Sequence, residues 1–234
     1  MIKLRFATAA ALLAVTGAAA AGNISATVSL VSDYDFRGVT QTLNDWTPQL
    51  GLTWTADTGM YYGIWGSDVD FQESGTSFAG YDRPSTEIDA FVGFSGENVV
   101  AYDLGLIYYA YPNAGDINSP EAYVGINKGP LGLKVWYSWD WGGSGKYELY
   151  TEANVTVPMG DDFTFLGHVG YSKFDPALGA DDYYDWSAGF GYKVSNFDLS
   201  FKWADGSNLK VGTAQPRELG RFIFAASTTL PWGE

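Results

Sequence analysis

Acidic residues occur in three pairs, each with one residue between its two members. The pairs are Asp33 with Asp35, Asp68 with Asp70, and Glu87 with Asp89. This spacing places both carboxylates of a pair on one face of a β-strand. Carboxylates gathered at one end of a pore would attract cations or bind a divalent ion through their oxygens. The simpler interpretation is a solvated wall in which Arg37 and Arg221 pair with them, and the sequence leaves both interpretations open.

His168 is the only histidine, and Ser172 follows it four residues later, so both belong to the same face of a strand. A serine hydrolase in an outer-membrane barrel would need these side chains within hydrogen-bonding reach on the lipid-facing side. Both occupy the polar face, which favours a histidine that lines the lumen. The sequence has no cysteine, no zinc-ligand spacing and no glycine-rich phosphate loop. We therefore predict no enzymatic activity and no cofactor, and assign no residue as a metal ligand.

β-Strands must position these side chains, because apolar and polar residues alternate with a period of two. In the first run, for example, Val28 and Leu30 lie on one face and Thr27 and Ser29 on the other. The alternation predicts twelve strands, over residues 24–37, 46–56, 61–71, 86–94, 100–109, 121–127, 131–139, 147–157, 163–174, 184–193, 197–203 and 221–230.

The connections between these strands alternate in length. Long ones cover residues 38–45, 72–85, 110–120, 140–146, 175–183 and 204–220, while tight turns lie at Asp57, Ser95, Lys128, Pro158 and Ser195. An even strand count with short turns at one end and long loops at the other is typical of a bacterial outer-membrane barrel. The predicted fold is thus all-β, a transmembrane antiparallel up-and-down β-barrel of about 12 strands, with short periplasmic turns and longer extracellular loops. The loops at 72–85 and 110–120 could fold inward as constrictions.

Alternation alone does not say which face is inside. A soluble barrel of the lipocalin type buries its apolar face, whereas a membrane barrel turns that face to lipid. Twelve strands enclose more space than side chains fill, and the polar face carries charges in nearly every strand, so we expect the apolar face to meet lipid. Tyr and Trp near strand ends are the candidates for an interfacial aromatic girdle. They are Trp46, Tyr61, Trp65, Tyr109, Trp139, Tyr147, Tyr184, Trp186, Tyr192 and Trp203.

The polar faces of the strands predict the charges that line the pore. Besides the six acids of the mouth, the pore-lining candidates are Arg37, Asp103, Glu121, Lys134, Glu148, Glu152, His168, Asp185, Lys193, Asp198, Lys202 and Arg221. Twelve acids then oppose five bases, which is an excess of seven negative charges. Because wall charges of one sign select the opposite ion, we predict a preference for cations, dominated by Asp68, Asp70, Glu87 and Asp89.

The first 21 residues have the pattern of a secretory signal peptide. Lys3 and Arg5 precede an apolar stretch, and four alanines at 18–21 provide a cleavage site. Removal of residues 1–21 would leave an outer-membrane β-barrel of residues 22–234 with 11 basic and 27 acidic residues, a net charge of −16. Such a chain is not expected to bind nucleic acid or anionic membrane surfaces.

Four segments resemble the TorF family of porin-like bacterial proteins. They are residues 31–42 (VSDYDFRGVTQT), 63–71 (GIWGSDVDF), 108–112 (YYAYP) and 167–171 (GHVGY). The resemblance implies an outer-membrane porin of undefined substrate. One departure concerns the terminal aromatic residue that the barrel assembly machinery reads in many such proteins. Here the chain continues after Leu230 as PWGE, which bears on the efficiency of insertion rather than on the fold.

The sequence thus predicts a channel in the outer membrane of a Gram-negative bacterium, for passive diffusion of small hydrophilic solutes or cations. The alternative is a plugged structural or adhesive barrel with no transport role. The expected partners are outer-membrane lipid, the transported solutes and the barrel assembly machinery. We expect a monomer, with a trimer as the alternative.

Overall fold

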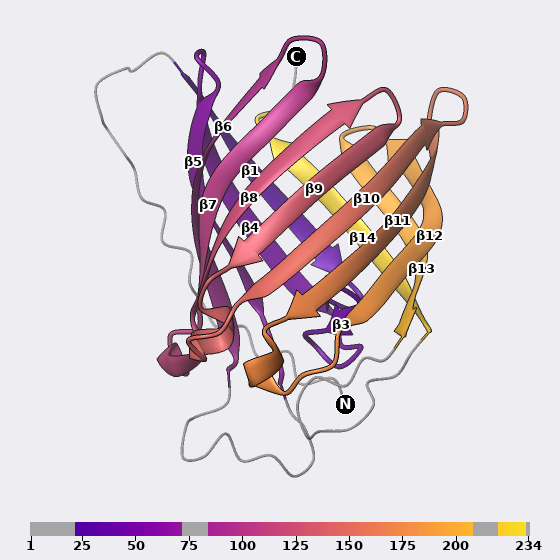
Figure 1. The fold of residues 1–234 in the computed structure, drawn as a ribbon. Coiled ribbons are helices and arrows are strands. Elements are labelled where there is room, and N and C mark those ends of the chain that lie inside the picture. Colours follow the sequence, from indigo (N-terminus) through magenta and orange to yellow (C-terminus); the bar gives the residue numbers. More distant parts are fainter. Residues whose placement is uncertain (1–21, 72–83, 208–219, 233–234) are drawn as a thin grey trace.

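The computed structural model describes residues 22–71, 84–207 and 220–232 (Figure 1). The predicted signal peptide, residues 1–21, lies outside the described residues. Twelve strands form one closed barrel: β1 (Gly22–Val31), β4 (Thr47–Ala56), β5 (Met60–Asp68), β6 (Thr86–Glu97), β7 (Ala101–Ala110), β8 (Ser119–Lys128), β9 (Leu131–Ser138), β10 (Glu148–Pro158), β11 (Phe163–Phe174), β12 (Tyr183–Val194), β13 (Phe197–Ser207) and β14 (Arg221–Leu230).

Each of these strands pairs antiparallel with its neighbours along the chain, and β1 closes the barrel against β14. The closing register runs from Ala26 opposite Leu230 to Val31 opposite Ala225. Closure leaves no barrel strand with an unpaired edge. The predicted twelve-stranded antiparallel up-and-down barrel is confirmed.

Short turns gather at the upper end in Figure 1, and the long connections gather at the lower end. At the lower end lie three short 3-10 helices, η1 (Gly115–Ile117), η2 (Trp141–Gly143) and η3 (Pro176–Leu178). Within the described part of the chain, no helix is both long and apolar enough to cross a lipid bilayer.

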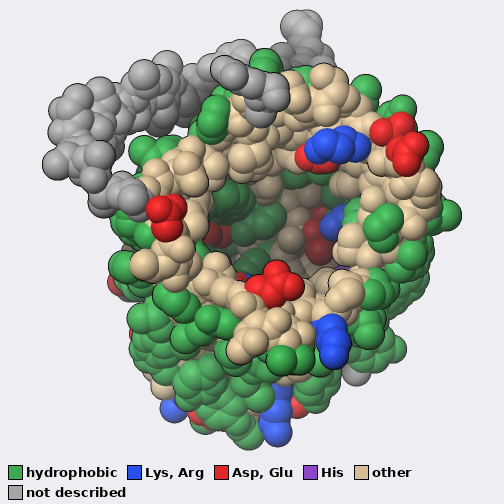
Figure 2. Space-filling view, turned by 90° about the horizontal axis from the view of Figure 1, so that it is seen from above, with side chains coloured by type: hydrophobic (Ala, Val, Ile, Leu, Met, Phe, Trp, Pro, Cys, Tyr) green, Lys and Arg blue, Asp and Glu red, His purple; other side chains and the backbone are tan. Residues whose placement is uncertain are grey.

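The apolar face of the strands points outward and the polar face inward. In β6, Ile88, Val92 and Phe94 are 40% exposed or more, while Glu87 and Asp89 between and beside them are buried. Seen from the short-turn end, the barrel is hollow, with mainly apolar side chains on its outside and charged side chains among others on its inner wall (Figure 2). This arrangement is the reverse of a lipocalin-type barrel, in which apolar side chains fill the interior.

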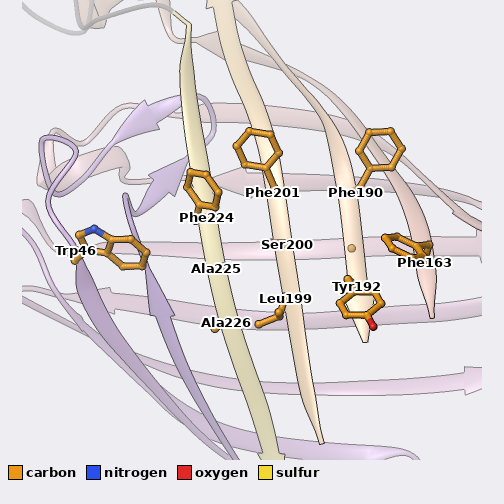
Figure 3. Close-up of a pocket in the computed structure, with 11 residues that line it drawn as sticks. Trp46, Phe163, Phe190, Tyr192, Leu199, Ser200, Phe201, Phe224, Ala225 and Ala226 are labelled. Carbon is orange, nitrogen blue, oxygen red and sulfur yellow. The ribbon is translucent and has the colours of Figure 1, made fainter. Parts of the chain in front are cut away.

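Aromatic rings are dense on the outer surface of β12 to β14. Phe190, Phe201 and Phe224 line a shallow apolar groove there, with Phe163 at one side and Trp46 at the other (Figure 3). Rings of β13 and β14 also pack on one another, as in the stacked pair of Phe201 and Phe222. Such a surface is stable only against an apolar medium or partner.

The first predicted strand is wrong in its extent. β1 ends at Val31 rather than at residue 37. Residues 32–46, called the inner loop below, connect it to β4, and their part 33–42 turns into the barrel. Two short strands, β2 (Asp35–Phe36) and β3 (Val39–Thr40), pair within it as a hairpin. The alternation of polar and apolar residues continues through β2, so the period of two could not show where the barrel strand ends.

The predicted inward face of the third strand is also wrong. Tyr61 and Trp65 point into the barrel, whereas Tyr62, Ile64 and Asp68 point outward and are exposed. Aromatic residues occupy both faces of β5, so its two faces have nearly the same hydrophobicity. Polar and apolar alternation therefore could not fix their direction.

Candidate functional site: the lumen and its inner loop

The inner loop reverses direction at Arg37 and Gly38. Both residues have positive φ, 52° and 79°, the backbone of a type I′ hairpin turn. A side chain at position 38 would meet the Cβ of Asp185 on the barrel wall at 2.5 Å. Glycine at this position therefore allows both the turn and its close approach to β12.

Arg37 extends from the tip of the hairpin to two glutamates of the wall. Its Nη1 and Nη2 donate to Oε1 and Oε2 of Glu121 on β8 at 3.0 and 2.7 Å, and Nη1 also donates to Glu148 on β10. Both glutamates are fully buried. Burial lowers the pKa of Arg37, but the charges of Glu121 and Glu148 more than offset it and raise that pKa well above its usual value. The guanidinium therefore stays charged.

A second arginine reaches the inner loop from the opposite direction. Arg221, on β14, donates through Nε to Asp33 at 2.5 Å, through Nη2 to Asp35 and through Nη1 to the carbonyl oxygen of Gly38 at 3.1 Å. Burial raises the pKa of Asp35, although Arg221 and Lys202 both lower it. The two arginines thus fasten the hairpin to strands β8, β10 and β14.

Three of the four acids predicted to dominate the pore mouth are not open to it. Asp68 faces outward, and the backbone of Asp70, beyond the end of β5, donates to the inner loop at Gln41. Glu87 and Asp89 face inward but are only 1% and 4% exposed. Tyr34 of the inner loop covers this part of the wall and donates to Glu87 at 2.9 Å. The predicted open mouth of carboxylates is therefore not found at Asp68, Glu87 and Asp89, because Asp68 faces outward and the inner loop covers the other two.

Among the described residues, the connection that enters the lumen, the inner loop, is not one of the two predicted. Residues 72–83 of the first predicted constriction lie outside the described residues. The segment 111–118 of the second forms η1, which packs beside η2 at the rim. Local sequence patterns therefore did not predict the inward fold of residues 32–46. The residue pair Arg37-Gly38, which forms the hairpin turn, was the only local signal of it.

Next to the hairpin the lumen contains a cavity of about 300 Å³. Its lining combines aromatic and hydrogen-bonding side chains: Asp35, Phe36, Arg37, Tyr109, Trp136, Tyr150, Glu152, Asn154, His168, Ser187 and Lys202. The indole nitrogen of Trp136 donates to Glu152 at 2.8 Å, and Asn154 donates to the other carboxylate oxygen at 3.1 Å. The cavity is thus polar and its side chains are held in place by one another.

His168 belongs to this network. Its Nδ1 lies 2.8 Å from Asn154 Oδ1, and its Nε2 lies 2.9 Å from Asp185 Oδ1 and 3.0 Å from the hydroxyl of Tyr150. Ser172 faces inward as expected, but no hydrogen bond joins it to His168 in the described chain. The pair is therefore not arranged as a nucleophile and its base.

Further charged pairs line the wall toward the short turns. Lys134 donates to Asp103 at 2.9 Å and lies over the ring of Tyr123, and Tyr61 donates to the same aspartate. Near the turn between β12 and β13, Lys193 and Asp198 form an exposed pair at 3.2 Å. Among the described residues, no group of three or more histidine, aspartate and glutamate side chains is arranged to hold a metal ion.

The predicted aromatic girdle divides between the two faces of the wall. Outward lie Trp46, Trp139, Tyr147, Tyr184, Trp186, Tyr192 and Trp203, exposed themselves or packed on exposed outer rings. Tyr61, Trp65 and Tyr109 instead point inward, and their placement in the girdle is wrong. Tyr61 and Tyr109 each stand beside a second tyrosine, Tyr62 and Tyr108, that takes the outward position. In such a tyrosine pair, composition does not distinguish the inner ring from the outer one.

A model for the family described as "Bacterial protein of unknown function (Gcw_chp)" matches residues 15–223. The chain belongs to the Gcw_chp family. This match does not test the resemblance to the TorF family. No curated protein matches the sequence.

Several solved structures share the barrel fold of this Gcw_chp protein. The KdgM porin is similar with a TM-score of 0.54 and 10% identity, over 87% of this chain and 98% of the porin. The KdgM porin in complex with disordered oligogalacturonate is similar with a TM-score of 0.50 and 10% identity, over 88% of this chain and 97% of the porin. A structure from work on the in-meso crystallization of membrane proteins is similar with a TM-score of 0.52 and 8% identity, over 88% of this chain and 82% of that one. At such identities the similarity establishes the fold alone.

Proposed function

We propose that this protein is an outer-membrane channel through which small hydrophilic solutes diffuse, and that the inner loop narrows it at the end of the long connections. The observation that supports this most is a polar, hollow lumen inside a barrel whose outer side chains are apolar (Figure 2). An apolar outer face is stable in lipid, and a charged inner wall keeps water in the lumen. The likeness to the KdgM porin supports the same function at the level of the fold.

The remaining parts of the proposal follow from a barrel in the outer membrane. Residues 1–21 would be removed as a signal peptide, and residues 22–234 would be inserted as a monomer by the barrel assembly machinery. We place the short turns on the periplasmic side, as in outer-membrane barrels generally. The inner loop then narrows the lumen from the extracellular side.

We further propose a weak preference for cations. When Asp68 and Asp70 are removed from the twelve acids predicted to line the pore, ten acids and five bases of that predicted set remain. Most are paired, however, as Arg37 is with Glu121 and Glu148. Glu152 is the acid beside the cavity that bonds to neutral donors and to His168 rather than to a lysine or arginine, so we expect it to attract cations most. A long acidic sugar such as the oligogalacturonate bound by the KdgM porin suits this wall poorly.

The second candidate function is a plugged barrel with a structural or adhesive role. The observation that favours it is the attachment of the inner loop by two buried arginines to β8, β10 and β14. A loop so fastened would block rather than narrow the pore if nothing displaces it. The two functions differ in whether solutes pass at all.

Liposome swelling separates the two. Purified protein whose gel mobility changes on boiling, which shows a folded barrel, is inserted into vesicles and exposed to gradients of small sugars and amino acids. A channel accelerates swelling, and more for smaller solutes. A rate equal to that of protein-free vesicles, together with swelling in a variant whose residues 34–42 are replaced by a short glycine-serine linker, would instead support the plugged barrel.

A further inference from the structure

The wall recess that holds Arg37 has the chemistry of a guanidinium-binding site. Glu121 meets the guanidinium with both carboxylate oxygens, and Glu148 accepts from it as well. Three aromatic rings of the wall and rim surround the same group, with Tyr150, Trp141 and Trp136 centred 4.5, 5.6 and 5.8 Å from its central carbon. Paired carboxylate oxygens and aromatic faces are the two features that recognise a planar guanidinium in preference to an ammonium ion.

The recess presents two carboxyl groups to the single guanidinium of Arg37. Glu121 and Glu148 are both fully buried, and they face a single guanidinium. Attachment of a loop does not require such an arrangement, because apolar residues of similar volume often replace a buried ion pair without loss of stability. Two buried carboxylates are, however, stable as anions only beside a cation. Whenever Arg37 leaves, another cation must enter or the carboxylates must take up protons.

Arg37 is placed so that it can leave without opening the barrel. It stands at the tip of a two-residue turn, in a connection that is not paired into the barrel sheet. The barrel hydrogen bonds of β1 and β4 run from Gly22 opposite Ala56 to Val31 opposite Thr47 and stop where the inner loop begins. Movement of the hairpin therefore breaks side-chain contacts but no barrel ladder.

We propose that this recess, formed by Glu121, Glu148, Trp136, Trp141 and Tyr150, is a binding site for guanidinium-bearing solutes, and that Arg37 occupies it as a tethered ligand. A free guanidinium compound competes with Arg37 for the recess, and its binding releases the hairpin tip and widens the lumen. The binding part of this inference is independent of transport, whereas the widening rests on the proposed channel function.

The binding part is tested on the Arg37→Ala variant, in which the recess has lost its own cation. Methylguanidinium at millimolar concentration should raise the Tm of this variant in detergent saturably, by about 4 °C near tenfold excess over Kd. Methylammonium at the same ionic strength should produce less than half of that shift. The wild type should respond less than the variant, because Arg37 already fills the recess. Equal shifts with both cations, or none with either, would overturn the site.

Two further variants keep this test decisive. In Arg37→Ala/Glu121→Gln/Glu148→Gln the recess is neutral, so the response to methylguanidinium should disappear; a response that remains would place the binding elsewhere. If Arg37→Ala alone folds poorly, the readout becomes the yield of heat-modifiable barrel on refolding with each cation. Methylguanidinium should then increase that yield and methylammonium should not, and equal yields count against the site.

Displacement of Arg37 is tested on the wild-type protein in planar bilayers. Methylguanidinium added on the side of the long connections should increase the conductance above that measured with methylammonium, and it should not do so in Arg37→Ala. A conducting wild-type channel that does not respond, with binding to the variant intact, would overturn the displacement. No conductance under any condition, again with binding intact, would overturn the proposed channel function while the guanidinium site stands.

Discussion

Replacement of Arg221 by alanine should release the inner loop from the wall while leaving the barrel closed. The guanidinium of Arg221 makes three contacts to the loop, with Asp33, Asp35 and the carbonyl of Gly38, and Arg221 is only 6% exposed. Removal of one partner from a buried ion pair costs about 3–5 kcal/mol, because the remaining charge stays buried without a counter-ion. At about 1.4 kcal/mol for each tenfold change, the ratio of docked to released loop should fall by about 100- to 4,000-fold.

Limited trypsin digestion of the folded protein in detergent measures this ratio. The bond after Arg37 is protected while its side chain lies in the wall recess, and it becomes accessible only when the loop is released. Cleavage between Arg37 and Gly38 should accelerate in proportion to the released population, since local opening controls such cleavage. The boiled and unboiled forms of Arg221→Ala should still differ in gel mobility, which shows that the barrel itself persists.

Lys193→Ala is the matched control for loss of a cation. Lys193 also pairs with an aspartate, Asp198, but both side chains are more than half exposed. Such surface pairs contribute about 0–1 kcal/mol, so cleavage after Arg37 should change little. If Arg221→Ala is cleaved no faster than this control, Arg221 does not hold the loop and the argument from buried charge is refuted.

Three further predictions concern the outer face, the lumen charge and closure. Leu106→Arg places a cation at the middle of the outer face of β7 and should lower the free energy of unfolding in vesicles by about 2–4 kcal/mol. Leu131→Arg, at the short-turn end of β9, should lower it by about 0–1 kcal/mol. Equal losses in urea titrations would contradict a lipid-facing belt. Glu152→Gln should reduce the preference for potassium over chloride in reversal-potential measurements, while Asp68→Asn should not change it; the opposite order would show that the assignment of inner and outer faces is wrong. The wild-type barrel should migrate differently on gels before and after boiling, because a closed barrel satisfies its backbone hydrogen bonds internally, and identical mobility would contradict closure.

The sequence alone determined the architecture of this protein. Strand number, antiparallel order and the two ends of the barrel follow from local signals, namely a period of two, tight turns and the lengths of the connections. Those signals depend on a few adjacent residues, so they can be recognised without any knowledge of contacts across the barrel. They failed for the orientation of β5, where the Tyr61 side chain points into the barrel and the Tyr62 side chain points outward although both residues are tyrosines.

The tertiary structure alone decided what occupies the lumen. Residues 32–37 continue the alternation of β1, yet Arg37 enters the barrel because Glu121 and Glu148, 84 and 111 residues away along the chain, meet it there. Arg221, 188 residues from Asp33, completes the attachment. The sequence showed that carboxylates and arginines would share one end of the barrel, but local patterns do not specify which of them pair. Their pairing arises only when closure of β1 against β14 brings strands from the whole chain around one space. As a result, charges that were predicted to lie open at the mouth instead hold the inner loop in place.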